Sequence, residues 1–492
     1  MNPADSWPHD KPAHECGVIG LYAPGRDVAR LTFFALFALQ HRGQEAAGIA
    51  VSDGEDVAMH KASGLVSQVF DEGILARLRG HAAVGHTRYS TTGGGSAVNT
   101  QPIGCTSLVG DIAVAHNGNL VNTVSLRREM EAEGFAFIGT NDSEAIARLY
   151  AHYADLGAEE AARCTMERLQ GAYSVCVLTS RDLVAFRDPL GLRPLIIGEI
   201  EGGGYVVASE SCAFGPIRAR VLREVEPGEV IVIDENGLRS SLAVPSPRRA
   251  MCLFEFIYFA RPDSVMRDEL VYSARFRMGE HLANEHPVDA DAVVPVPDSG
   301  FPAAIGYSRR SGIPLVEGLI KSRYIHRTFI QPDPEMRKLG VRLKLSPLRE
   351  QIEGRRLILV DDSIVRSTTM GQIVRLLKDS GAKEVHVRIT APPIISPCYY
   401  GIDMPTKNEL AAATRTEDEI CAQIGADSLG YLSLEGTTRA VGRPHGEFCT
   451  ACFTGDYPIP ISEAVTKHAL EPDHRAGDME AVASGQLRLL NE

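Results

Sequence analysis

The stretch 357–369, with the sequence LILVDDSIVRSTT, constrains the fold more than any other part of the chain. Its first four residues, 357–360, are apolar and predict a fully buried parallel strand. Two adjacent carboxylates follow the strand, and a short loop rich in hydroxyl groups comes next. Residues 370–378 have the apolar spacing of a helix, and Thr368 or Thr369 is its expected N-cap. The order of strand, loop and helix predicts an α/β domain with a parallel sheet.

The same stretch favours a ligand that carries both a phosphate and a diol. A helix N-terminus offers unpaired backbone N–H groups and the positive end of the helix dipole, which suit a phosphate. Asp361 and Asp362 would repel a phosphate in direct contact, so we expect them to face ribose hydroxyls or a magnesium ion. The pattern therefore indicates a sugar phosphate. The alternative is an ordinary doubly wound sheet whose strand ends happen to be acidic.

This pattern resembles the signature with which type I phosphoribosyltransferases bind phosphoribosylpyrophosphate (PRPP). The resemblance implies that the aspartates contact the ribose hydroxyls and Mg²⁺, and that the loop holds the 5′-phosphate. The implied PRPP-binding residues are Asp361, Asp362, Ser363, Arg366, Ser367, Thr368 and Thr369. Ser367 departs from the family, which often has glycine there, and a loop that needs φ > 0 at this position would be strained.

Composition limits the class of protein. At 492 residues the chain is too long for one ordinary core, so two domains are expected. Its 44% hydrophobic and 23% charged residues are typical of globular proteins, and no apolar run is long enough to cross a membrane. A net charge of −13 argues against nucleic acid or an anionic membrane as the main partner. Ten cysteines without a secretory signal predict thiols in a reducing cytoplasm.

The first half of the chain alternates short β-type runs with helical segments. Strands are expected at 16–20, 47–51, 82–87, 112–115, 173–178, 195–198, 205–208 and 229–233. Helices are expected at 28–39, 143–153 and 159–169. Many short strands with segregated helices predict an α+β domain with antiparallel sheets.

Polar residues near the ends of these strands form a candidate amino-acid site. The planar guanidinium of Arg88 suits an α-carboxylate, and Asp142 suits an α-ammonium group. The Asn117 amide and the Gly118 N–H can stabilise an oxyanion, and a thiol nucleophile at Cys16 completes an amide hydrolase. Each residue has a structural alternative: Cys16 as a small buried residue, Asp142 as a helix cap, and Asn117 with Gly118 as a turn.

Five segments of this half resemble class II glutamine amidotransferases: CGVIG (16–20), LQHRGQEAAG (39–48), GHTRYS (85–90), HNGN (116–119) and RDPLGLRP (187–194). Those enzymes are N-terminal-nucleophile hydrolases with an αββα fold. Their cysteine must be the first residue, because its own α-amino group is the general base. The resemblance implies that residues 1–15 are a propeptide cleaved before Cys16. A flexible tail or a mis-assigned start codon is the alternative.

The pattern changes after residues 244–249, VPSPRR, which are rich in proline and basic residues and form the best linker. Strands expected at 292–297, 314–319, 357–360 and 385–390 predict a parallel sheet with ligands at its carboxyl edge. In the resembled family the loop 297–300 binds pyrophosphate, which implies that Ser299 touches Mg²⁺. The segment 321–345 carries seven basic residues against two acidic ones and predicts a lid over PRPP. Within it, His326 stands where the family often has glycine.

Four cysteines in the second half form a possible Cys₄ site. They are Cys252, Cys398, Cys449 and Cys452. Spacing alone does not separate zinc from a [4Fe–4S] cluster. The flanking residues resemble the iron–sulfur class of PRPP amidotransferases, which implies one [4Fe–4S] cluster per chain. The other cysteines are expected in the core: Cys105, Cys164, Cys176, Cys212 and Cys421.

The resemblances cover about residues 16–460. They imply a propeptide (1–15), a class II glutamine amidotransferase domain (16–245), a phosphoribosyltransferase domain (250–465) and a C-terminal tail (466–492). Enzymes with this combination form 5-phosphoribosylamine, glutamate and pyrophosphate from PRPP, glutamine and water, which begins purine synthesis. The family implies a cytoplasmic homotetramer that binds one Mg²⁺ per chain and is inhibited by purine nucleotides.

Two alternatives belong to other functional classes. Another class II amidotransferase, such as glucosamine-6-phosphate synthase or asparagine synthetase, would need a different acceptor domain, and the PRPP signature disfavours it. A non-enzymatic PRPP-responsive regulator is disfavoured by the complete set of glutaminase residues and by the absence of a basic DNA-binding segment.

Overall fold

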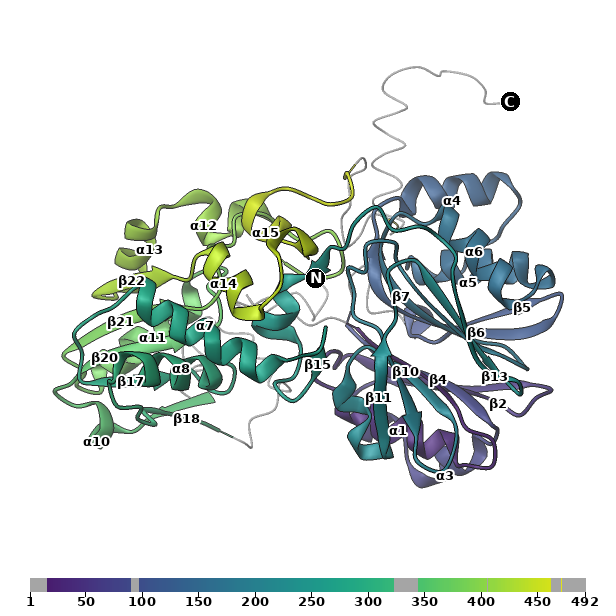
Figure 1. The fold of residues 1–492 in the computed structure, drawn as a ribbon, viewed down its shortest axis with the longest axis horizontal. Helices are drawn as coiled ribbons and strands as arrows, with labels where there is room; N and C mark the ends of the chain where they lie inside the picture. Colours follow the sequence, from purple (N-terminus) through teal and green to yellow (C-terminus); the bar gives the residue numbers. More distant parts are fainter. Residues whose placement is uncertain (1–15, 90–96, 323–343, 405, 462–469, 471–492) are drawn as a thin grey trace, which may run out of the picture. The chain divides into compact units, whose positions relative to one another are not determined.

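The computed structural model describes residues 16–89, 97–322, 344–404, 406–461 and 470 (Figure 1). Contacts divide them into two compact units. The first unit contains the described residues up to Met251, together with Tyr399–Asp403 and those from Ile459 onward. The second contains Cys252–Cys398 and the described residues of Met404–Pro458. The first boundary therefore lies just after the predicted linker 244–249.

The first unit is built on two antiparallel sheets. Within the described residues one sheet has seven strands, in the order β11-β9-β10-β1-β4-β2-β3, and the other has six, in the order β13-β12-β8-β7-β6-β5. The strands of the first sheet are β1 (Gly17–Tyr22), β2 (Ala46–Ser52), β3 (Val57–Ser63), β4 (Ala82–Arg88), β9 (Ile196–Ile200), β10 (Tyr205–Ala208) and β11 (Ala219–Glu224). Those of the second are β5 (Ile103–Ser107), β6 (Gly110–Leu120), β7 (Gly171–Leu178), β8 (Leu183–Arg187), β12 (Glu229–Asp234) and β13 (Gly237–Leu242).

Helices cover the outer faces of these sheets. The helices are α1 (Val28–Ala38), α2 (Val66–Val69), α3 (Glu72–Arg77), α4 (Thr123–Ala132), α5 (Ser143–Tyr153) and α6 (Ala158–Arg168). One apolar core lies between the two sheets, and a second joins the β6–β7–β8–β12 face to α4, α5 and α6. Helix α1 packs on β1 and β4 (Figure 1). The four layers confirm the predicted αββα fold.

The second unit contains a parallel sheet in the order β17-β20-β21-β22. Its main elements are α7 (Val271–Glu285), β17 (Ala292–Pro295), α8 (Phe301–Ser311), β20 (Arg356–Asp361), α11 (Thr368–Asp379), β21 (Glu384–Ile389), α13 (Glu417–Ile424), β22 (Ser428–Tyr431) and α14 (Leu434–Val441). Shorter elements are β15 (Val265–Met266), β16 (Glu269–Leu270), β18 (Leu319–Lys321), β19 (Leu345–Pro347), α10 (Arg349–Ile352), α12 (Ala411–Thr414) and α15 (Ala451–Thr454). The predicted α/β domain with a parallel sheet is confirmed.

One predicted strand of this sheet is wrong. Residues 314–318 make only an isolated parallel bridge, between Leu315 and Val293, and Leu319 is the first residue of β18. The chain then turns away, and β18 pairs antiparallel with β19 instead of extending the main sheet. An apolar run predicts burial, but it does not specify which strand the run pairs with.

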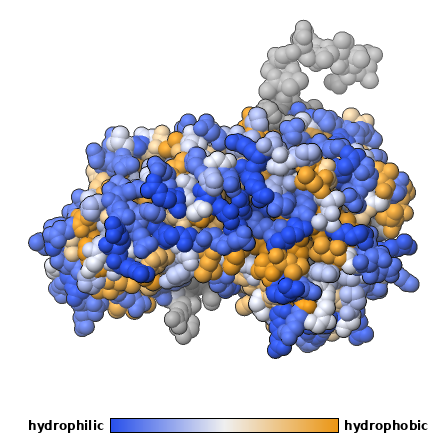
Figure 2. All heavy atoms as spheres, in the orientation of Figure 1, coloured by the Kyte–Doolittle hydropathy of each residue, from blue (hydrophilic) through white to orange (hydrophobic). Residues whose placement is uncertain are grey.

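Among the described residues, every helix is too short or too polar to cross a lipid bilayer. Hydrophilic residues dominate the face shown in Figure 2, and the apolar residues on it form small, separate patches.

Candidate functional site

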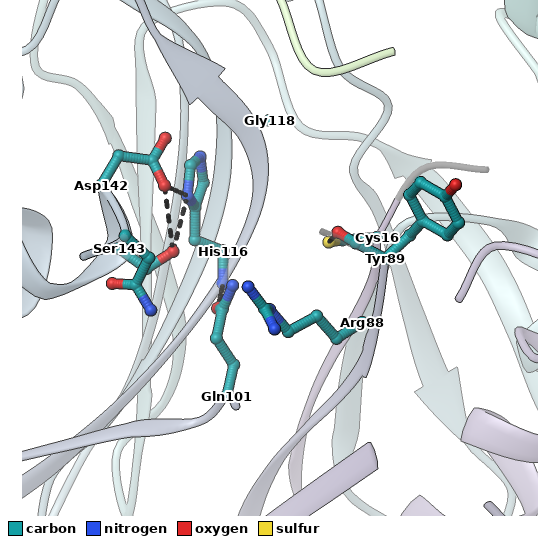
Figure 3. A pocket seen from close by; sticks show the side chains of 9 residues that line it. Cys16, Arg88, Tyr89, Gln101, His116, Gly118, Asp142 and Ser143 are labelled. Atoms are coloured by element: carbon teal, nitrogen blue, oxygen red, sulfur yellow. Dashed lines mark hydrogen bonds and ion pairs between the residues drawn. The ribbon is translucent and has the colours of Figure 1, made fainter. Parts of the chain in front are cut away.

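A pocket in the first unit brings together four of the five residues predicted for amide hydrolysis. Cys16 precedes β1, Arg88 ends β4, Gly118 lies in β6, and Asp142 directly precedes α5. Residues from both sheets and from a helix N-terminus therefore face one another (Figure 3). The other residues that line the pocket are Tyr89, Gln101, His116, Asn141 and Ser143.

Cys16 is buried, and its thiol donates a hydrogen bond to the carbonyl oxygen of Tyr89 (3.3 Å). Burial raises the pKa of the Cys16 thiol to about 11, against the opposing effect of the nearby positive charge of Arg88. At neutral pH such a thiol is almost entirely protonated. It therefore needs a base before it can attack as a thiolate.

A buried ion-pair network holds the backbone of Cys16. The Arg42 side chain, which is 1% exposed, donates from Nε to the Cys16 carbonyl oxygen (3.0 Å). Arg42 also pairs with the buried Glu210 (2.5 Å), and His41 Nε2 lies 2.7 Å from the same carboxylate. Arginine suits this position, because its guanidinium has several N–H donors and can bind the Glu210 carboxylate and the Cys16 carbonyl at the same time.

Asn117 and Gly118 lie inside β6, where they pair with Ser174 and Tyr173 of β7. The prediction that a strand ends at residue 115, and the alternative of a turn, are both wrong. Asparagine followed by glycine is a strong turn signal, but here the strand continues through it. Gly118 has φ +145°, and a Cβ atom there would lie 2.0 Å from the Ala172 carbonyl oxygen, so the position requires glycine.

The Asn117 side chain does not line the pocket around Cys16. Ala113 and Ala115 belong to the core between the sheets, and alternation along β6 places Asn117 on that same face. Its Nδ2 is buried and has no hydrogen-bond partner among the described residues. A buried donor without an acceptor is costly, which makes Asn117 a candidate for a ligand contact.

Asp142 is buried and accepts a hydrogen bond from the Leu120 backbone N–H (3.0 Å). Its side chain makes no capping bond to α5, so the alternative role as a side-chain helix cap is wrong. The Ser143 hydroxyl lies 3.4 Å from the Asp142 carboxylate and 3.1 Å from His116 Nδ1 (Figure 3). His116 Nδ1 is itself 3.8 Å from the Asp142 carboxylate. Burial lowers the pKa of His116, so its ring is neutral at pH 7.

His86 connects the two sheets behind the pocket. Its Nε2 lies 3.0 Å from the His116 carbonyl oxygen, and the side chain is fully buried in β4. Burial lowers the pKa of His86 to about 3. The ring is therefore neutral at pH 7, and Nε2 must be the protonated nitrogen that donates this hydrogen bond.

Several residues of this site escaped sequence reasoning. Four of them are adjacent in sequence to predicted residues and could have been inferred from that position: Tyr89, His116, Asn141 and Ser143. Gln101 had no such signal. Its side chain accepts a hydrogen bond from the His116 backbone N–H (2.7 Å), which is a tertiary contact.

The second unit places the predicted PRPP residues at the carboxyl end of β20. Asp361 ends that strand, and Asp362 is 2% exposed. The hydroxyls of Ser299 and Ser363 donate to the two carboxylate oxygens of Asp362 (2.5 and 2.6 Å). Ser299 and Asp362 are 63 residues apart, so the structure brings together two residues that the sequence related only through family resemblance.

The loop after β20 ends in a strained residue. Ser367, and not Thr368 or Thr369, is the N-cap of α11, and it has the left-handed conformation with φ +66°. The strain expected from the departure at Ser367 is therefore present. Thr368 and Thr369 open the helix, and Arg366 pairs with Glu409 (2.9 Å). Most of the predicted lid, including His326, lies outside the described residues.

The four cysteines of the predicted cluster site belong to the second unit. The short strands β14 (Met251–Cys252) and β23 (Phe448–Cys449) pair with each other. The backbone of Cys452 accepts hydrogen bonds from Ile395 and Ser396, close to Cys398 in the chain. Burial and the proximity of the other three cysteines raise the pKa of Cys452 well above its usual value. Nevertheless, no group of three or more His, Cys, Asp or Glu side chains in the described parts is arranged to hold a metal ion.

The other cysteines fit the core prediction only in part. Cys176 and Cys212 are buried, but Cys105, Cys164 and Cys421 are half-buried. None of the ten cysteines, all of which lie in described segments, is in a disulfide.

Two domain families match the chain in the order of the two units. A glutamine amidotransferase domain matches residues 86–215, and a phosphoribosyl transferase domain matches residues 274–392. The first match lies in the first unit and the second in the second unit.

Full-length relatives share both parts. The chain is 50% identical to the amidophosphoribosyltransferase of Synechococcus elongatus and 52% identical to that of Synechocystis, over 94% of this chain and of each relative. It is 49% identical to the enzyme of Methanocaldococcus jannaschii, over 91% of this chain and 98% of the relative.

Two solved structures share the fold. The glutamine PRPP amidotransferase of B. subtilis, complexed with ADP and GMP, matches with a TM-score of 0.87 and 44% identity over 92% of this chain and 100% of that one. A structure described as the allosteric regulatory enzyme of purine biosynthesis matches with a TM-score of 0.88 and 45% identity over 93% and 99%. With such identity over nearly the whole length of each relative, the chain belongs to the amidophosphoribosyltransferase family.

Proposed function

We propose that the two units divide the family's reaction between them, and we assign its steps to residues of this chain. The protein uses glutamine and PRPP to form 5-phosphoribosylamine, the first step of purine biosynthesis. The first unit, here called the glutaminase unit, releases ammonia from glutamine. The second, here called the acceptor unit, uses that ammonia to displace pyrophosphate from PRPP.

The observation that carries the glutaminase assignment is the pocket that joins Cys16, Arg88, Gly118 and Asp142. The Cys16 sulfur attacks the side-chain amide carbon of glutamine, and water then releases glutamate. Because the thiol has a pKa of about 11, it needs an adjacent base. Cleavage between Glu15 and Cys16 supplies one, since a free α-amino group has a pKa of about 7.7–8.0, so about a tenth of it is unprotonated at pH 7 and can accept the thiol proton.

The other residues of the glutaminase unit bind the substrate and the intermediate. The Arg88 guanidinium binds the α-carboxylate of glutamine, and Asp142 binds the α-ammonium group. The Gly118 N–H and the Asn117 side-chain amide donate to the oxyanion that forms when the thiolate attacks. The buried and unpartnered Nδ2 of Asn117 supports this role.

In the acceptor unit, Asp361 and Asp362 bind the ribose hydroxyls of PRPP. The loop and the start of α11 bind the 5′-phosphate through Ser363, Arg366, Ser367, Thr368 and Thr369. Ammonia then attacks C1 of the ribose, and pyrophosphate leaves. Ammonia is mostly protonated in neutral water, so delivery along a path closed to water keeps it nucleophilic.

Magnesium fits the oxygen ligands at the end of β20. Ser299, Asp361 and Asp362 would hold one Mg²⁺ per chain, and the ion would neutralise charge on the departing pyrophosphate. Mg²⁺ is commonly bound by one or two carboxylates together with substrate phosphates, so it requires no complete cage of protein ligands. The hydrogen bond that joins Ser299 to Asp362 supports this assignment.

A [4Fe–4S] cluster fits the four cysteines of the acceptor unit. Cys452 is buried close to Cys252, Cys398 and Cys449, and thiolates are the usual ligands of such clusters. The cluster would bind together distant segments of the chain, a structural contribution.

We also propose a cytoplasmic homotetramer inhibited by purine nucleotides. Ten cysteines outside disulfides suit a reducing compartment. The solved B. subtilis relative is complexed with ADP and GMP, which supports nucleotide binding by this chain. The homotetramer rests on family resemblance alone.

Replacement of the nucleophile separates the two half-reactions. Cys16→Ser preserves the shape of the pocket but replaces the thiol with a far weaker nucleophile, so glutamine-dependent activity should fall by several orders of magnitude. Ammonium chloride at high pH supplies ammonia directly, so the variant should still release pyrophosphate from PRPP. An assay of released pyrophosphate measures both the glutamine-dependent and the ammonia-dependent rate. Full glutamine-dependent activity in the variant, or loss of the ammonia-dependent reaction in a folded variant, would refute the assignment.

A further inference from the structure

A short segment far along the chain belongs to the glutaminase unit. Tyr399–Asp403 is separated from the rest of that unit by most of the acceptor unit in sequence. Arg193, which is 1% exposed, donates from two of its nitrogens to the Tyr400 carbonyl oxygen (2.9 and 2.6 Å). The Tyr400 hydroxyl donates to the Ile459 carbonyl oxygen (2.6 Å) and accepts from the Ile459 N–H (2.9 Å). The segment is therefore anchored within its own unit by buried hydrogen bonds from Arg193 and by partly buried ones to Ile459.

The same segment lies directly against β6. The Asn119 side-chain amide donates to the Tyr399 carbonyl oxygen (3.0 Å). Two residues further on, Gly401 packs on Gly118: a Cβ atom at Gly401 would lie 2.9 Å from the Gly118 carbonyl carbon and 3.1 Å from its oxygen. Gly401 also has φ +110°, so glycine is required there both for space and for conformation.

Gly118 needs such a neighbour because glycine has little conformational preference of its own. Its φ of +145° is outside the range that other residues adopt readily. A hydrogen-bond donor for an oxyanion works only if its direction is set before the reaction. The Ala172 carbonyl of β7 closes one side of Gly118, and Gly401 closes another. Together they limit the orientations that the Gly118 backbone can take.

We propose that Tyr399–Asp403 is a positioning segment for the oxyanion donor at Gly118, with Arg193 as its anchor. The inference rests on the proposed roles of Cys16 and Gly118. In it, Gly401 touches neither glutamine nor Cys16. It acts by holding the backbone that presents the Gly118 N–H. A small displacement of that backbone reduces the stabilisation of the transition state more than it reduces the affinity for glutamine.

Gly401→Ala tests the proposal. The added methyl group must push against the Gly118 backbone, so kcat for glutamine should fall at least tenfold, toward the hundred- to thousandfold loss that removal of an oxyanion donor causes. The glutamine KM should change by less than about threefold, because Arg88 and Asp142 are not displaced. Ammonia-dependent release of pyrophosphate should keep its wild-type rate, because the PRPP residues are all in the acceptor unit.

Gly203→Ala is the matched control. Gly203 lies in the same unit with φ +111°, nearly the φ of Gly401, but a Cβ atom there meets nothing within 4 Å. The control therefore carries the backbone strain without the contact, and its glutamine kcat should equal that of the wild type. A similar fall in both variants would show that strain alone is responsible and would overturn the proposal.

A gentler variant covers a failure of Gly401→Ala to fold. Asn119→Ala removes the hydrogen bond to Tyr399 together with the other contacts of that side chain, among them a longer hydrogen bond to the Leu120 carbonyl oxygen (3.4 Å), and should lower kcat for glutamine several-fold with an unchanged KM. Wild-type kcat in both Gly401→Ala and Asn119→Ala, or a parallel loss of the ammonia-dependent reaction, would refute the positioning role. Failure of the proposed function itself looks different, since Cys16→Ser would then retain glutamine-dependent activity.

Discussion

The carboxylate of Asp362 accepts hydrogen bonds from Ser299 and Ser363, which leaves it fixed at the end of β20 before any ligand arrives. Asp362→Asn removes the negative charge while it keeps the size of the side chain. A charge-assisted hydrogen bond contributes about 1.5–3 kcal/mol, so the KM for PRPP should rise roughly ten- to a hundredfold. Pyrophosphate release at varied PRPP measures the effect. Glutamine hydrolysis should be unaffected, and so should PRPP use in the exposed control Asp418→Asn. An unchanged KM in Asp362→Asn would contradict the assigned role.

His86 makes stability depend on pH. Its pKa is about 3 in the folded protein, because of burial, and near 6.5 in the unfolded chain. Between these values the unfolded chain binds a proton that the folded protein does not, so stability is full above about pH 6.5 and is lost as the pH falls toward about 3. At pH 5.5 the loss should be about 1.4 kcal/mol. Thermal midpoints at pH 7, 6 and 5 measure it.

His86→Gln is the comparison for this prediction, since glutamine keeps a side-chain donor but does not titrate. Other groups with a lowered pKa, including His116, titrate in both proteins, so the difference between the two curves isolates His86. The midpoint of the variant should fall less on acidification. Parallel curves would contradict the prediction.

The loop between β20 and α11 combines a glycine-like conformation with a serine side chain. Ser367→Gly removes the αL strain but adds freedom to the unfolded chain, so the free energy of unfolding should change by less than about 1 kcal/mol. Ser367→Val places a β-branched residue at φ +66° and should destabilise by about 1–3 kcal/mol. Thermal midpoints measure both changes. Thr368→Val, at an ordinary helical position, is the control and should stay close to the wild type. A valine at 367 that is as stable as serine would contradict the prediction.

The sequence predicted the positions of helices and strands correctly wherever the periodicity of apolar residues was strong. The helix predicted at 143–153 is α5 without change, and β20 and β21 lie within one residue of their predicted bounds. Weakly apolar edge strands such as β11 and β13 gave no signal, because their residues are half-buried or exposed on both faces and show no apolar alternation. Residues 314–319 show the opposite failure: they are apolar enough for a strand, but pairing elsewhere decides their conformation.

The candidate sites were predictable for a different reason. Cys16, Arg88, Gly118 and Asp142 stand in short, specific motifs, so their roles could be inferred before their proximity was known. The contribution of Arg42 to the position of Cys16 could not be predicted, because it depends on Glu210 from a distant loop. Tyr399–Asp403 carries no sequence signal for the unit it joins, since membership of a unit is a tertiary property.

At the scale of the whole molecule, the proposed cluster predicts the metal content. Protein purified without oxygen should be brown and contain about four irons per chain. Cys452→Ser should lose most of the iron and unfold at a lower temperature, because metal binding contributes to folding stability. The half-buried Cys105, outside the proposed site, provides the control: Cys105→Ser should keep its iron. Colourless protein with stoichiometric zinc would overturn the cluster assignment.

The return of Tyr399–Asp403 to the glutaminase unit has a consequence during synthesis on the ribosome. A chain folds as it emerges, N-terminal part first. The glutaminase sheets are complete when Met251 has emerged, but the segment that covers Gly118 follows about 150 residues later. At usual rates of synthesis that delay is on the order of ten seconds. A nascent chain therefore has its glutaminase strands before the segment that the positioning proposal assigns to Gly118. Under that proposal, we expect full glutamine hydrolysis only after three of the four described strands of the acceptor sheet have been made.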